Sequence, residues 1–384
     1  MFKQLCVPFY TMYIHSYLFS PHQIPGGKLS LITKLVKERL ANRENSLSPY
    51  ASKSNNSAGR QLPGTPSPIR TEFQRDRDRI IHCKSFRRLK HKTQVFIAPK
   101  GDHYVTRLTH TLEVSQISRT IARALNLNED LSEAISLGHD LGHTPFGHIG
   151  EHKLNQIHPD GFRHAEQSLR IVQILEKNGS GLNLTPETLQ GIVSHSKPRG
   201  DFLNKLTPEN LSLEGQICRI ADAVAYLNHD LLDSFRAGIL NEDSIPSEVN
   251  NVLGTRHSQR LNTMVSDIIA NSWDATGETK KSLDNIPVIS MSQELRNTIN
   301  VLREFMFETV YLPIDQGQKG EAARQVIQIL YDFYSKNSDQ IPTEYQGNDR
   351  STLDYIAGMT DQYAMQAAEK IEPGIAKILE QGLV

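Results

Sequence analysis

The chain has 384 residues, above the roughly 250–300 at which a single hydrophobic core stops growing, so one large domain with appendages and two domains both fit. Hydrophobic residues make up 38% and charged residues 22% of the chain, which excludes a disordered or fibrous protein. With 42 Lys and Arg against 43 Asp and Glu, there is no global basic field of the kind that coats nucleic acid or an anionic membrane, so any phosphate binding must be local.

The N-terminal part of the chain has the composition of a peripheral segment. Residues 1–28 mix aromatic residues and leucine with proline and histidine, and they lack the apolar run and cleavage site of a signal peptide, so we interpret them as an extension. Residues 29–70 follow as a short charged helix over 29–44 and an arm rich in Ser, Gly and Pro. No stretch approaches the roughly 18 apolar residues of a membrane span. Three scattered cysteines without a CxxC pair favour a reducing cytoplasm.

From Thr71 onward, apolar residues recur at helical spacing, and the sequence therefore predicts an all-α fold. Period-two alternation supports at most a small β-hairpin around Gly101, between residues 94–97 and 103–106. Longer helices are expected over about 109–125, 213–235, 258–272, 292–312, 320–336 and 351–382.

Capping signals mark the starts of three further helices. Asn128 is a suitable N-cap for a helix that continues to about His139. Pro145 and Pro186 each follow a threonine, which predicts a helix with proline at its first position.

The densest group of chemically active side chains is HDLGHTPFGHIGE, residues 139–151. Adjacent residues on a helix point about 100° apart, so His139 and Asp140 can share a metal ion only if other helices complete its ligands. His110, on the upstream amphipathic helix, and Asp222, in the middle of an apolar helix, are the candidates. Two imidazoles and two carboxylates suit Mn, Mg, Fe, Ni or Zn, and they leave positions for water, as in a catalytic site.

Each of these features also has a structural explanation. An HD dipeptide alone is weak evidence for a metal, and Asp222 alone could be a core carboxylate paired with Arg219 or Arg236. His148 and Glu151 are three residues apart and share a helix face, as an acid/base pair would, but a solvated helix face has the same spacing. The combination is far stronger evidence than its parts.

At this point the sequence resembles a known family. The four candidate ligands, in chain order, resemble the H…HD…D pattern of the HD phosphohydrolase superfamily. More narrowly, RTEFQRDRDRIIHCKSFRRLKHKTQVF, GDHYVTRLTHTLEVSQISRTIARAL, LGHDLGHTPFGHIGE and YIAGMTDQYA resemble bacterial dGTPase-like deoxynucleoside triphosphate triphosphohydrolases, over about residues 45–384. The resemblance implies an HD-domain helical fold for residues 71–384, with the metal-site core at about 103–240 and additional C-terminal helices.

The resemblance implies metal-dependent hydrolysis of dGTP or of several dNTPs to deoxynucleoside and inorganic triphosphate. We hypothesise that water activated by the metal attacks the α-phosphorus, while His148 handles the proton at the O5′ leaving group, supported by Glu151 and His164. The expected cofactor is a divalent ion of open identity. The expected partners are a dNTP substrate, an activating nucleotide, further copies of this chain and weakly bound single-stranded nucleic acid, with no membrane.

One helix face suggests how a sugar would be recognised. Tyr226 and Asp230 continue the face of Asp222 at intervals of four, so a carboxylate can accept from a 3′-hydroxyl while the ring packs on the deoxyribose and excludes a 2′-hydroxyl. Ordinary core packing is the alternative for Tyr226. Resemblance to mammalian dNTP hydrolases that join a SAM domain to this core implies one more 3′-hydroxyl contact and two phosphate contacts: Gln94, Arg107 and His143.

A basic stretch could hold the triphosphate or an effector nucleotide, although such runs are usually solvated faces. Arginine can bind two phosphate oxygens at once, so Arg87 or Arg88 is the better candidate within it. The stretch and its later counterparts are Arg87, Arg88, Lys90, His91, Lys92, Lys197 and Arg199.

Two other functions stay open. The first is another HD phosphohydrolase, acting on nucleotide monophosphates, cyclic nucleotides or guanosine polyphosphates; the HTPFGHIGE run argues against it. The second is a catalytically silent nucleotide-binding regulator, which would be expected to have lost a metal ligand or His148. None of these residues is lost.

Overall fold

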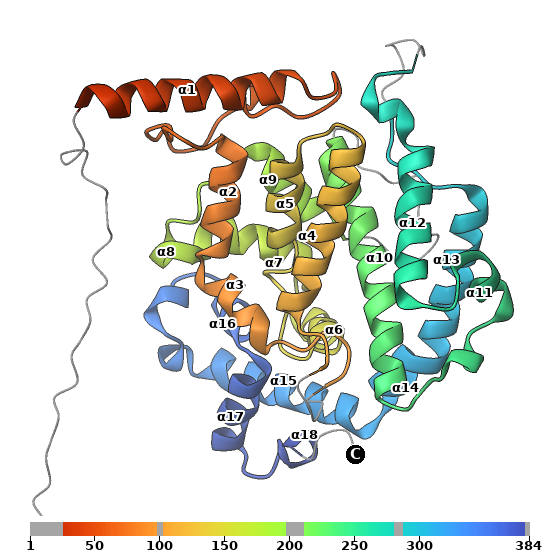
Figure 1. The fold of residues 1–384 in the computed structure, drawn as a ribbon. Coiled ribbons are helices and arrows are strands. Elements are labelled where there is room, and N and C mark those ends of the chain that lie inside the picture. Colours follow the sequence, from red (N-terminus) through yellow and green to blue (C-terminus); the bar gives the residue numbers. More distant parts are fainter. Residues whose placement is uncertain (1–25, 98–102, 197–210, 280–286, 381–384) are drawn as a thin grey trace, which may run out of the picture.

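The structure is a computed structural model, and it describes residues 26–97, 103–196, 211–279 and 287–380 (Figure 1). Within these ranges the chain is helical and contains no strand, as the sequence predicts. The expected hairpin is reduced to one antiparallel bridge between Thr93 and Thr106, and its tip at Gly101 lies outside the described residues. None of the described helices combines the length and the apolar character that a membrane span needs.

A bundle of helices forms the centre of the molecule. Its helices are α2 (Glu72–Ile81), α3 (Lys84–Arg88), α4 (Arg107–Ala124), α5 (Glu129–Gly138), α6 (Gly147–Ile157), α7 (His164–Arg170), α8 (Glu176–Gly179), α9 (Pro186–Ser194) and α10 (Leu213–Arg236). Helix α4 packs against α5 and α10, α2 packs against α5, and α9 packs against α5, α7 and α10. Figure 1 shows α2, α5, α4 and α10 side by side.

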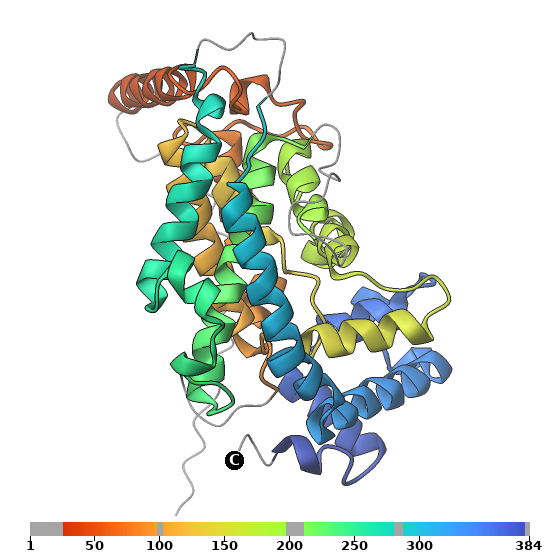
Figure 2. The same cartoon turned by 90° about the vertical axis from the view of Figure 1, so that its right-hand side faces the viewer.

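Further helices flank this bundle on two sides. Helices α12 (His257–Asn271) and α13 (Gln293–Met306) pack against α10, and α11 (Ser247–Leu253) packs against α12 and α13. The π-helical segment η7 (Phe307–Tyr311) and α14 (Leu312–Gln316) follow α13. The C-terminal helices are α15 (Gln318–Lys336), α16 (Ser351–Gly358), α17 (Asp361–Ile371) and α18 (Lys377–Glu380). They lie across the lower end of the bundle, where α15 packs against α6 (Figures 1 and 2).

The remaining elements are short or peripheral. Helix α1 (Gly26–Asn45) corresponds to the charged helix expected over 29–44, and it lies across the upper end of the bundle in Figure 1. The short helical segments are η2 (Ser54–Asn56), η3 (Leu89–His91), η4 (Ile171–Leu175), η5 (Glu242–Ser244), η6 (Trp273–Thr276), η8 (Ser338–Gln340) and η9 (Thr343–Tyr345). Residues 1–25 of the extension predicted over 1–28 lie outside the described residues, and residues 26–28 form the first turn of α1. Lys197 and Arg199 also lie outside the described residues.

Side-chain caps explain where several helices begin. Asn128 accepts from the Leu131 N–H at the start of α5, as its sequence context predicts. Thr106 forms a reciprocal capping box with Thr109, which fixes where α4 begins. Pro186 occupies the first turn of α9, as predicted.

The helix predicted to start at Pro145 starts instead at Gly147, so this prediction is wrong. Phe146, the residue before the helix, has a φ of 60°, and this left-handed conformation prevents a right-handed helix from running through it; Gly147, with a φ of 58°, is the first residue of α6. The Phe146 N–H donates to Asp361 Oδ1 at 3.1 Å, a long-range bond that local sequence signals do not contain. A Cβ at residue 147 would lie 2.9 Å from Arg107 Nη2, so glycine is required there for both conformation and space.

The helical stretch expected over 351–382 is divided. Helix α16 ends at Gly358, and Thr360 caps a separate helix, α17, which ends at Ile371. The break turns the first residue of α17, Asp361, toward the bundle, where its side chain is buried.

Two buried ionisable side chains join the C-terminal helices to the bundle. Lys92 Nζ donates to the carbonyl oxygens of His143, at 2.5 Å, and Ala357, at 2.7 Å. Asp361 Oδ2 accepts from the backbone N–H of Thr93, at 3.0 Å, and from its hydroxyl, at 2.7 Å. Burial lowers the pKa of Lys92 to about 7, with Arg88 contributing in the same direction.

This lowered pKa predicts that the contribution of Lys92 to the stability of the folded protein increases as the pH rises above 7. Between pH about 7 and about 10 the unfolded chain holds a proton on Lys92 that the folded chain has released, so the free energy of unfolding increases with pH. In urea denaturation, the stability difference between the wild type and Lys92→Met should grow from pH 7 to pH 9, by up to about 1.4 kcal/mol per pH unit. The exposed side chain of Lys90 provides the control, because the free energy of unfolding of Lys90→Met should change with pH as that of the wild type does. An equal slope in wild type and Lys92→Met would contradict the assignment.

Candidate active site

Four side chains from three parts of the bundle converge, and we call them the metal cluster: His110 on α4, His139 and Asp140 directly after α5, and Asp222 on α10. His110 Nε2 lies 3.2 Å from Asp222 Oδ1 and 3.9 Å from Asp140 Oδ2. His139 Nε2 lies 3.4 Å from Asp140 Oδ1 and 3.9 Å from Asp222 Oδ1. Ligand atoms about 2.1 Å from one ion are about 3–4 Å apart, so these atoms could share a metal after small adjustments.

The His139 ring is oriented as a metal ligand would be. Its Nδ1–H donates to the Ser136 carbonyl oxygen at 2.6 Å, so the lone pair is on Nε2. This Nε2 is buried and has no hydrogen-bond partner, which is costly for a polar atom unless a further ligand satisfies it. The donor set of two imidazoles and two carboxylates therefore fits a divalent ion.

Asp222 faces histidine nitrogens. The two arginines considered as its core partners make other hydrogen bonds: Arg219 Nη1 donates to the Ser194 carbonyl oxygen at 2.7 Å, and Arg236 Nη1 to Asp233 Oδ1 at 2.7 Å. Burial alone would raise the pKa of Asp222, but the neighbouring histidines, of which His110 is the closest, lower it below its usual range.

Asp140 is the most densely surrounded member of the metal cluster. Its Oδ2 accepts from Arg107 Nη1 at 2.7 Å, and its Oδ1 faces the Nε2 atoms of His139, at 3.4 Å, and His143, at 3.6 Å. Burial would raise the pKa of Asp140, but these neighbours lower it well below the usual range. The carboxylate is therefore ionised while almost fully buried.

A second group, which we call the histidine cluster, lies beside Asp140. It consists of His143, His148, Glu151 and His164. Glu151 Oε2 accepts from His148 Nδ1 at 3.0 Å, and Glu151 Oε1 accepts from His164 Nδ1 at 2.7 Å and from its backbone N–H at 2.8 Å. Both oxygens of Glu151 are thus engaged, and both rings point Nε2 away from the carboxylate. The His148 side chain is 72% exposed, so it stands at the open side of the cluster.

A close backbone approach brings the two clusters together. Ser168, on α7, accepts from the Gly142 N–H at 2.8 Å and donates to the His139 carbonyl oxygen at 2.7 Å. A Cβ at residue 142 would lie 2.2 Å from the Ser168 backbone nitrogen, so only glycine lets α7 approach this closely and stack the His164 ring on that of His143.

Two histidines of the site were not identified from the sequence. His195 follows α9, and its Nε2 lies 3.0 Å from His164 Nε2 and 3.9 Å from Asp140 Oδ1. His229, on α10, places Nε2 2.9 Å from His110 Nδ1. A buried histidine seven residues after Asp222 on an apolar helix is a signal that could have revealed His229, whereas His195 has no comparable local signal.

The predicted sugar contacts lie on and beside α10. Tyr226 packs partly buried against the main hydrophobic core, so core packing accounts for part of its role. Asp230 Oδ2 accepts from the Tyr311 hydroxyl at 2.9 Å, and Asp230 Oδ1 lies 3.0 Å from His229 Nδ1. Gln94 Oε1 is buried without a hydrogen-bond partner, so this oxygen is available to a hydroxyl donor.

The two predicted phosphate contacts are both deeply buried. Arg107 uses Nη1 to bind Asp140, while its Nε has no hydrogen-bond partner. Burial and Arg107 lower the pKa of His143 well below its usual range, so the ring is neutral, and its Nδ1 also lacks a partner. Each side chain thus retains one nitrogen for a ligand.

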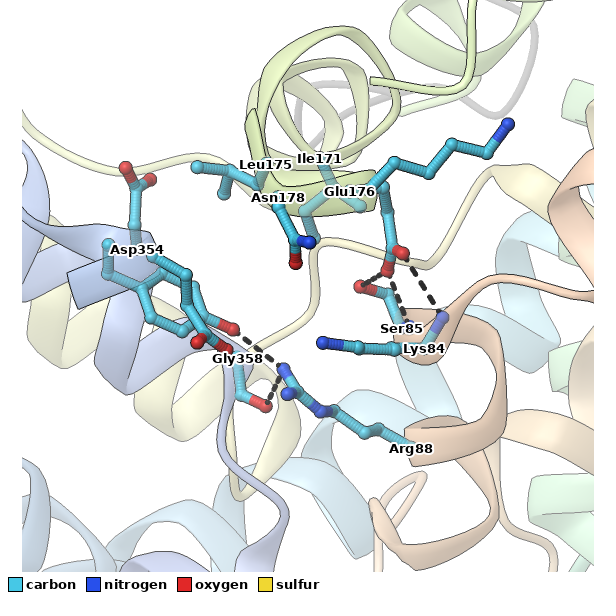
Figure 3. Close-up of a pocket in the computed structure, with 12 residues that line it drawn as sticks. Lys84, Ser85, Arg88, Ile171, Leu175, Glu176, Asn178, Asp354 and Gly358 are labelled. Carbon is cyan, nitrogen blue, oxygen red and sulfur yellow. Dashed lines mark hydrogen bonds between the residues drawn. The ribbon is translucent and has the colours of Figure 1, made fainter. Parts of the chain in front are cut away.

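Within the basic stretch, Arg88 has a structural contact. Its Nη1 donates to the Tyr345 hydroxyl at 2.9 Å and to the Gly358 carbonyl oxygen at 3.0 Å, so it joins α3 to α16 and η9 (Figure 3). The cavity in Figure 3 is also lined by Glu176 and Asp354, and by no member of the metal or histidine cluster. This arrangement does not favour Arg88 as a ligand of the substrate triphosphate.

Comparison with known proteins gives two family matches, the HD domain over residues 107–227 and the phosphohydrolase-associated domain over residues 289–370. The first match contains the whole metal cluster. The chain is similar to several proteins named deoxyguanosinetriphosphate triphosphohydrolase-like protein. The one from Caldanaerobacter subterraneus subsp. tengcongensis is 49% identical, over 85% of this chain and 92% of its own length. Those from Desulfatibacillum aliphaticivorans and Clostridium perfringens are 44% and 46% identical, each over 88% of this chain and 97% of its own length.

The geometry of the metal cluster predicts divalent-ion binding that depends on Asp222. A bound ion stabilises the folded state, so saturating Mn²⁺ should raise the thermal midpoint of the wild type. Asp222→Asn should weaken Mn²⁺ binding, measured by titration calorimetry, by at least roughly 10–100-fold. This lower bound is the loss of affinity that follows when a residue hydrogen-bonded to a metal ligand is removed, and Asp222 is expected to be a ligand itself. Glu166→Gln, at an exposed acid on α7, is the matched control and should bind Mn²⁺ like the wild type. Unchanged affinity in Asp222→Asn would remove Asp222 from the ligand set.

Proposed function

The chain belongs to the family of deoxyguanosinetriphosphate triphosphohydrolase-like proteins and contains an HD phosphohydrolase domain, and from this membership we propose that it hydrolyses deoxynucleoside triphosphates to deoxynucleoside and inorganic triphosphate. The observation that carries the proposal is the position of the Glu151-oriented histidines directly beside the buried metal cluster. The side chains that would bind the ion and those that would transfer a proton can therefore act on the same phosphate group of a substrate.

In this proposal, His110, His139, Asp140 and Asp222 hold a divalent ion. Such an ion, when bound, acts as a Lewis acid that polarises a phosphoryl oxygen and lowers the pKa of water. Arg107 keeps Asp140 ionised and oriented through its 2.7 Å hydrogen bond. The nitrogens of Arg107 and His143 that lack partners offer donors to phosphate oxygens.

His148 is the proton-transfer group of the proposal. Glu151 fixes the proton of His148 on Nδ1, so Nε2 can exchange a proton with the O5′ leaving group. Glu151 itself is a positioning residue, because its two oxygens are taken up by His148 and His164. Burial would raise the pKa of Glu151, but His164 and His148 lower it well below the usual range, which keeps it an acceptor.

The sugar contacts follow from the same geometry. The unsatisfied Gln94 Oε1 and the carboxylate of Asp230 are acceptors for a 3′-hydroxyl, and Tyr226 supplies a ring against the deoxyribose. A 2′-hydroxyl packed against this ring would lose hydration without gaining a partner, which favours deoxynucleotides.

Product analysis tests the reaction itself. The Mn²⁺-loaded protein should convert each accepted dNTP to one deoxynucleoside and one inorganic triphosphate, quantified by anion-exchange and reversed-phase chromatography. Incubation with each dNTP alone and in pairs would at the same time measure base preference and nucleotide activation. Release of pyrophosphate or monophosphate would contradict the proposal and favour another HD phosphohydrolase.

Replacement of His148 tests its role. Loss of a general acid/base group costs about 10²–10⁴-fold in turnover, so His148→Ala should lower kcat by this factor while nucleotide and Mn²⁺ binding stay close to wild type. His152→Ala removes an exposed histidine one turn along α6 and is the matched control, expected to leave kcat unchanged. If His148→Ala kept full turnover, the proton would have to be handled elsewhere.

A further inference from the structure

Two histidines stand on one exposed face of α6, and the proposed function uses only one of them. His148 and His152, which we call the histidine pair, are four residues apart in this helix, so their Cβ atoms lie about 5–6 Å apart on neighbouring turns. The His148 side chain is 72% exposed, and His152 is exposed as well. Two histidines at this spacing on a helix can bind one transition-metal ion together, as they do in helical zinc motifs.

The hydrogen bonds of both rings leave a lone pair on Nε2. Glu151 Oε2 can only accept, and it lies 3.0 Å from His148 Nδ1, so His148 carries its proton on Nδ1. Gln156 Nε2 can only donate, and it lies 3.3 Å from His152 Nε2, so the lone pair of His152 is on that atom. Gln156 is exposed, so its contact with His152 is easily given up to another ligand. Both rings therefore have the tautomer that a metal ion bound at Nε2 requires.

Glu151 supports metal binding by the histidine pair. A carboxylate that accepts from the second nitrogen of a ligating histidine fixes the orientation of the ring and raises its basicity. Glu151 is placed to do this for His148, and the spacing H-x-x-E-H of residues 148–152 is that of a zinc-binding helix motif. The carboxylate also offsets the partial positive charge of the first turn of α6, which by itself would disfavour a cation.

The histidine pair and the metal cluster differ in the ions that they prefer. Imidazole ligands suit Zn²⁺, Cu²⁺ and Ni²⁺, and the affinity of a given site for Mn²⁺ is the lowest in this series. The metal cluster contains two carboxylates among its four candidate ligands, and carboxylates suit Mn²⁺. Mn²⁺ at a concentration that fills the metal cluster should therefore leave the histidine pair open to Zn²⁺.

We propose that His148 and His152 bind a Zn²⁺ ion, with water at its remaining positions, and that this ion inhibits the enzyme. An ion on His148 Nε2 occupies the atom through which this ring would exchange a proton with the leaving group. The inhibition rests on the proposed function, because it requires His148 to be the proton-transfer group, whereas the binding does not. Turnover then responds to zinc through His152, a residue that takes no part in the reaction.

Zinc titration of the full-length, Mn²⁺-loaded protein tests the inhibition. Zn²⁺ should inhibit dNTP turnover by the wild type, and His152→Gln should raise the half-inhibiting concentration at least about tenfold, because two linked ligands bind far more tightly than one. Without Zn²⁺, both proteins should turn over dNTP equally. His152→Cys offers a thiolate in place of the imidazole and should keep the sensitivity of the wild type. His82→Gln, at an exposed histidine after α2, is the matched control and should also keep it.

Zinc binding is measured separately from turnover. Calorimetric titration of the Mn²⁺-loaded proteins with Zn²⁺ should show one more bound Zn²⁺ in the wild type than in His152→Gln. Any exchange of Zn²⁺ for Mn²⁺ in the metal cluster is common to both proteins, so it does not contribute to this difference. His82→Gln should bind as much Zn²⁺ as the wild type.

Equal zinc sensitivity in the wild type and His152→Gln would overturn the proposal, and so would Zn²⁺ bound to the histidine pair without loss of turnover. The outcome is separable from that of the proposed function. One additional Zn²⁺ in the wild type, with pyrophosphate as product, would reject the reaction and keep the site. Equal zinc binding by the wild type and His152→Gln, with triphosphate as product, would reject the site and keep the reaction.

Discussion

Asp140 is 4% exposed, and its two oxygens face Arg107 and four histidine rings. These partners come from three segments of the chain: α4, the segment that follows α5, and the end of α9. Removing a carboxylate from water costs several kcal/mol, and only well-placed partners offset this cost. The segments before and after α5, together with the end of α9, must therefore keep their relative positions for the charge to be tolerated. The same positions bring the candidate ligands together, so the stability of the bundle and the geometry of the site depend on one set of contacts.

The C-terminal helices take part in this geometry although they contribute no candidate ligand. Lys92 ties the His143 carbonyl oxygen to α16, and Asp361 holds the left-handed Phe146 at the start of α6. Helix α6 carries His148 and Glu151, and it packs on α15 in a separate hydrophobic cluster. The region that matches the phosphohydrolase-associated domain thus sets the position of the helix that bears His148, the proposed proton-transfer group.

The sequence was informative where local physics decides the outcome. Helical periodicity and side-chain caps such as Asn128 predict the all-α bundle, because both depend on residues a few positions apart. It failed at Pro145, where a hydrogen bond from residue 146 to Asp361 overrides a local signal. The cluster of His139 and Asp140 stands out in the sequence because its members are adjacent. His195 does not stand out, since only the packing of α9 against α7 brings it to His164.

His229 connects the proposed sugar contact Asp230 with the candidate metal ligand His110. If His110 Nε2 holds an ion, its proton must be on Nδ1, and this nitrogen faces His229 Nε2 at 2.9 Å. His229 must then accept there and carry its own proton on Nδ1, which lies 3.0 Å from Asp230 Oδ1. Asp230 already accepts from Tyr311 through its other oxygen, so a sugar hydroxyl must share an acceptor with one of these groups. Because a carboxylate oxygen has two lone pairs, such sharing is feasible. It would make the strength of the sugar contact depend on the same hydrogen-bond chain that orients His110.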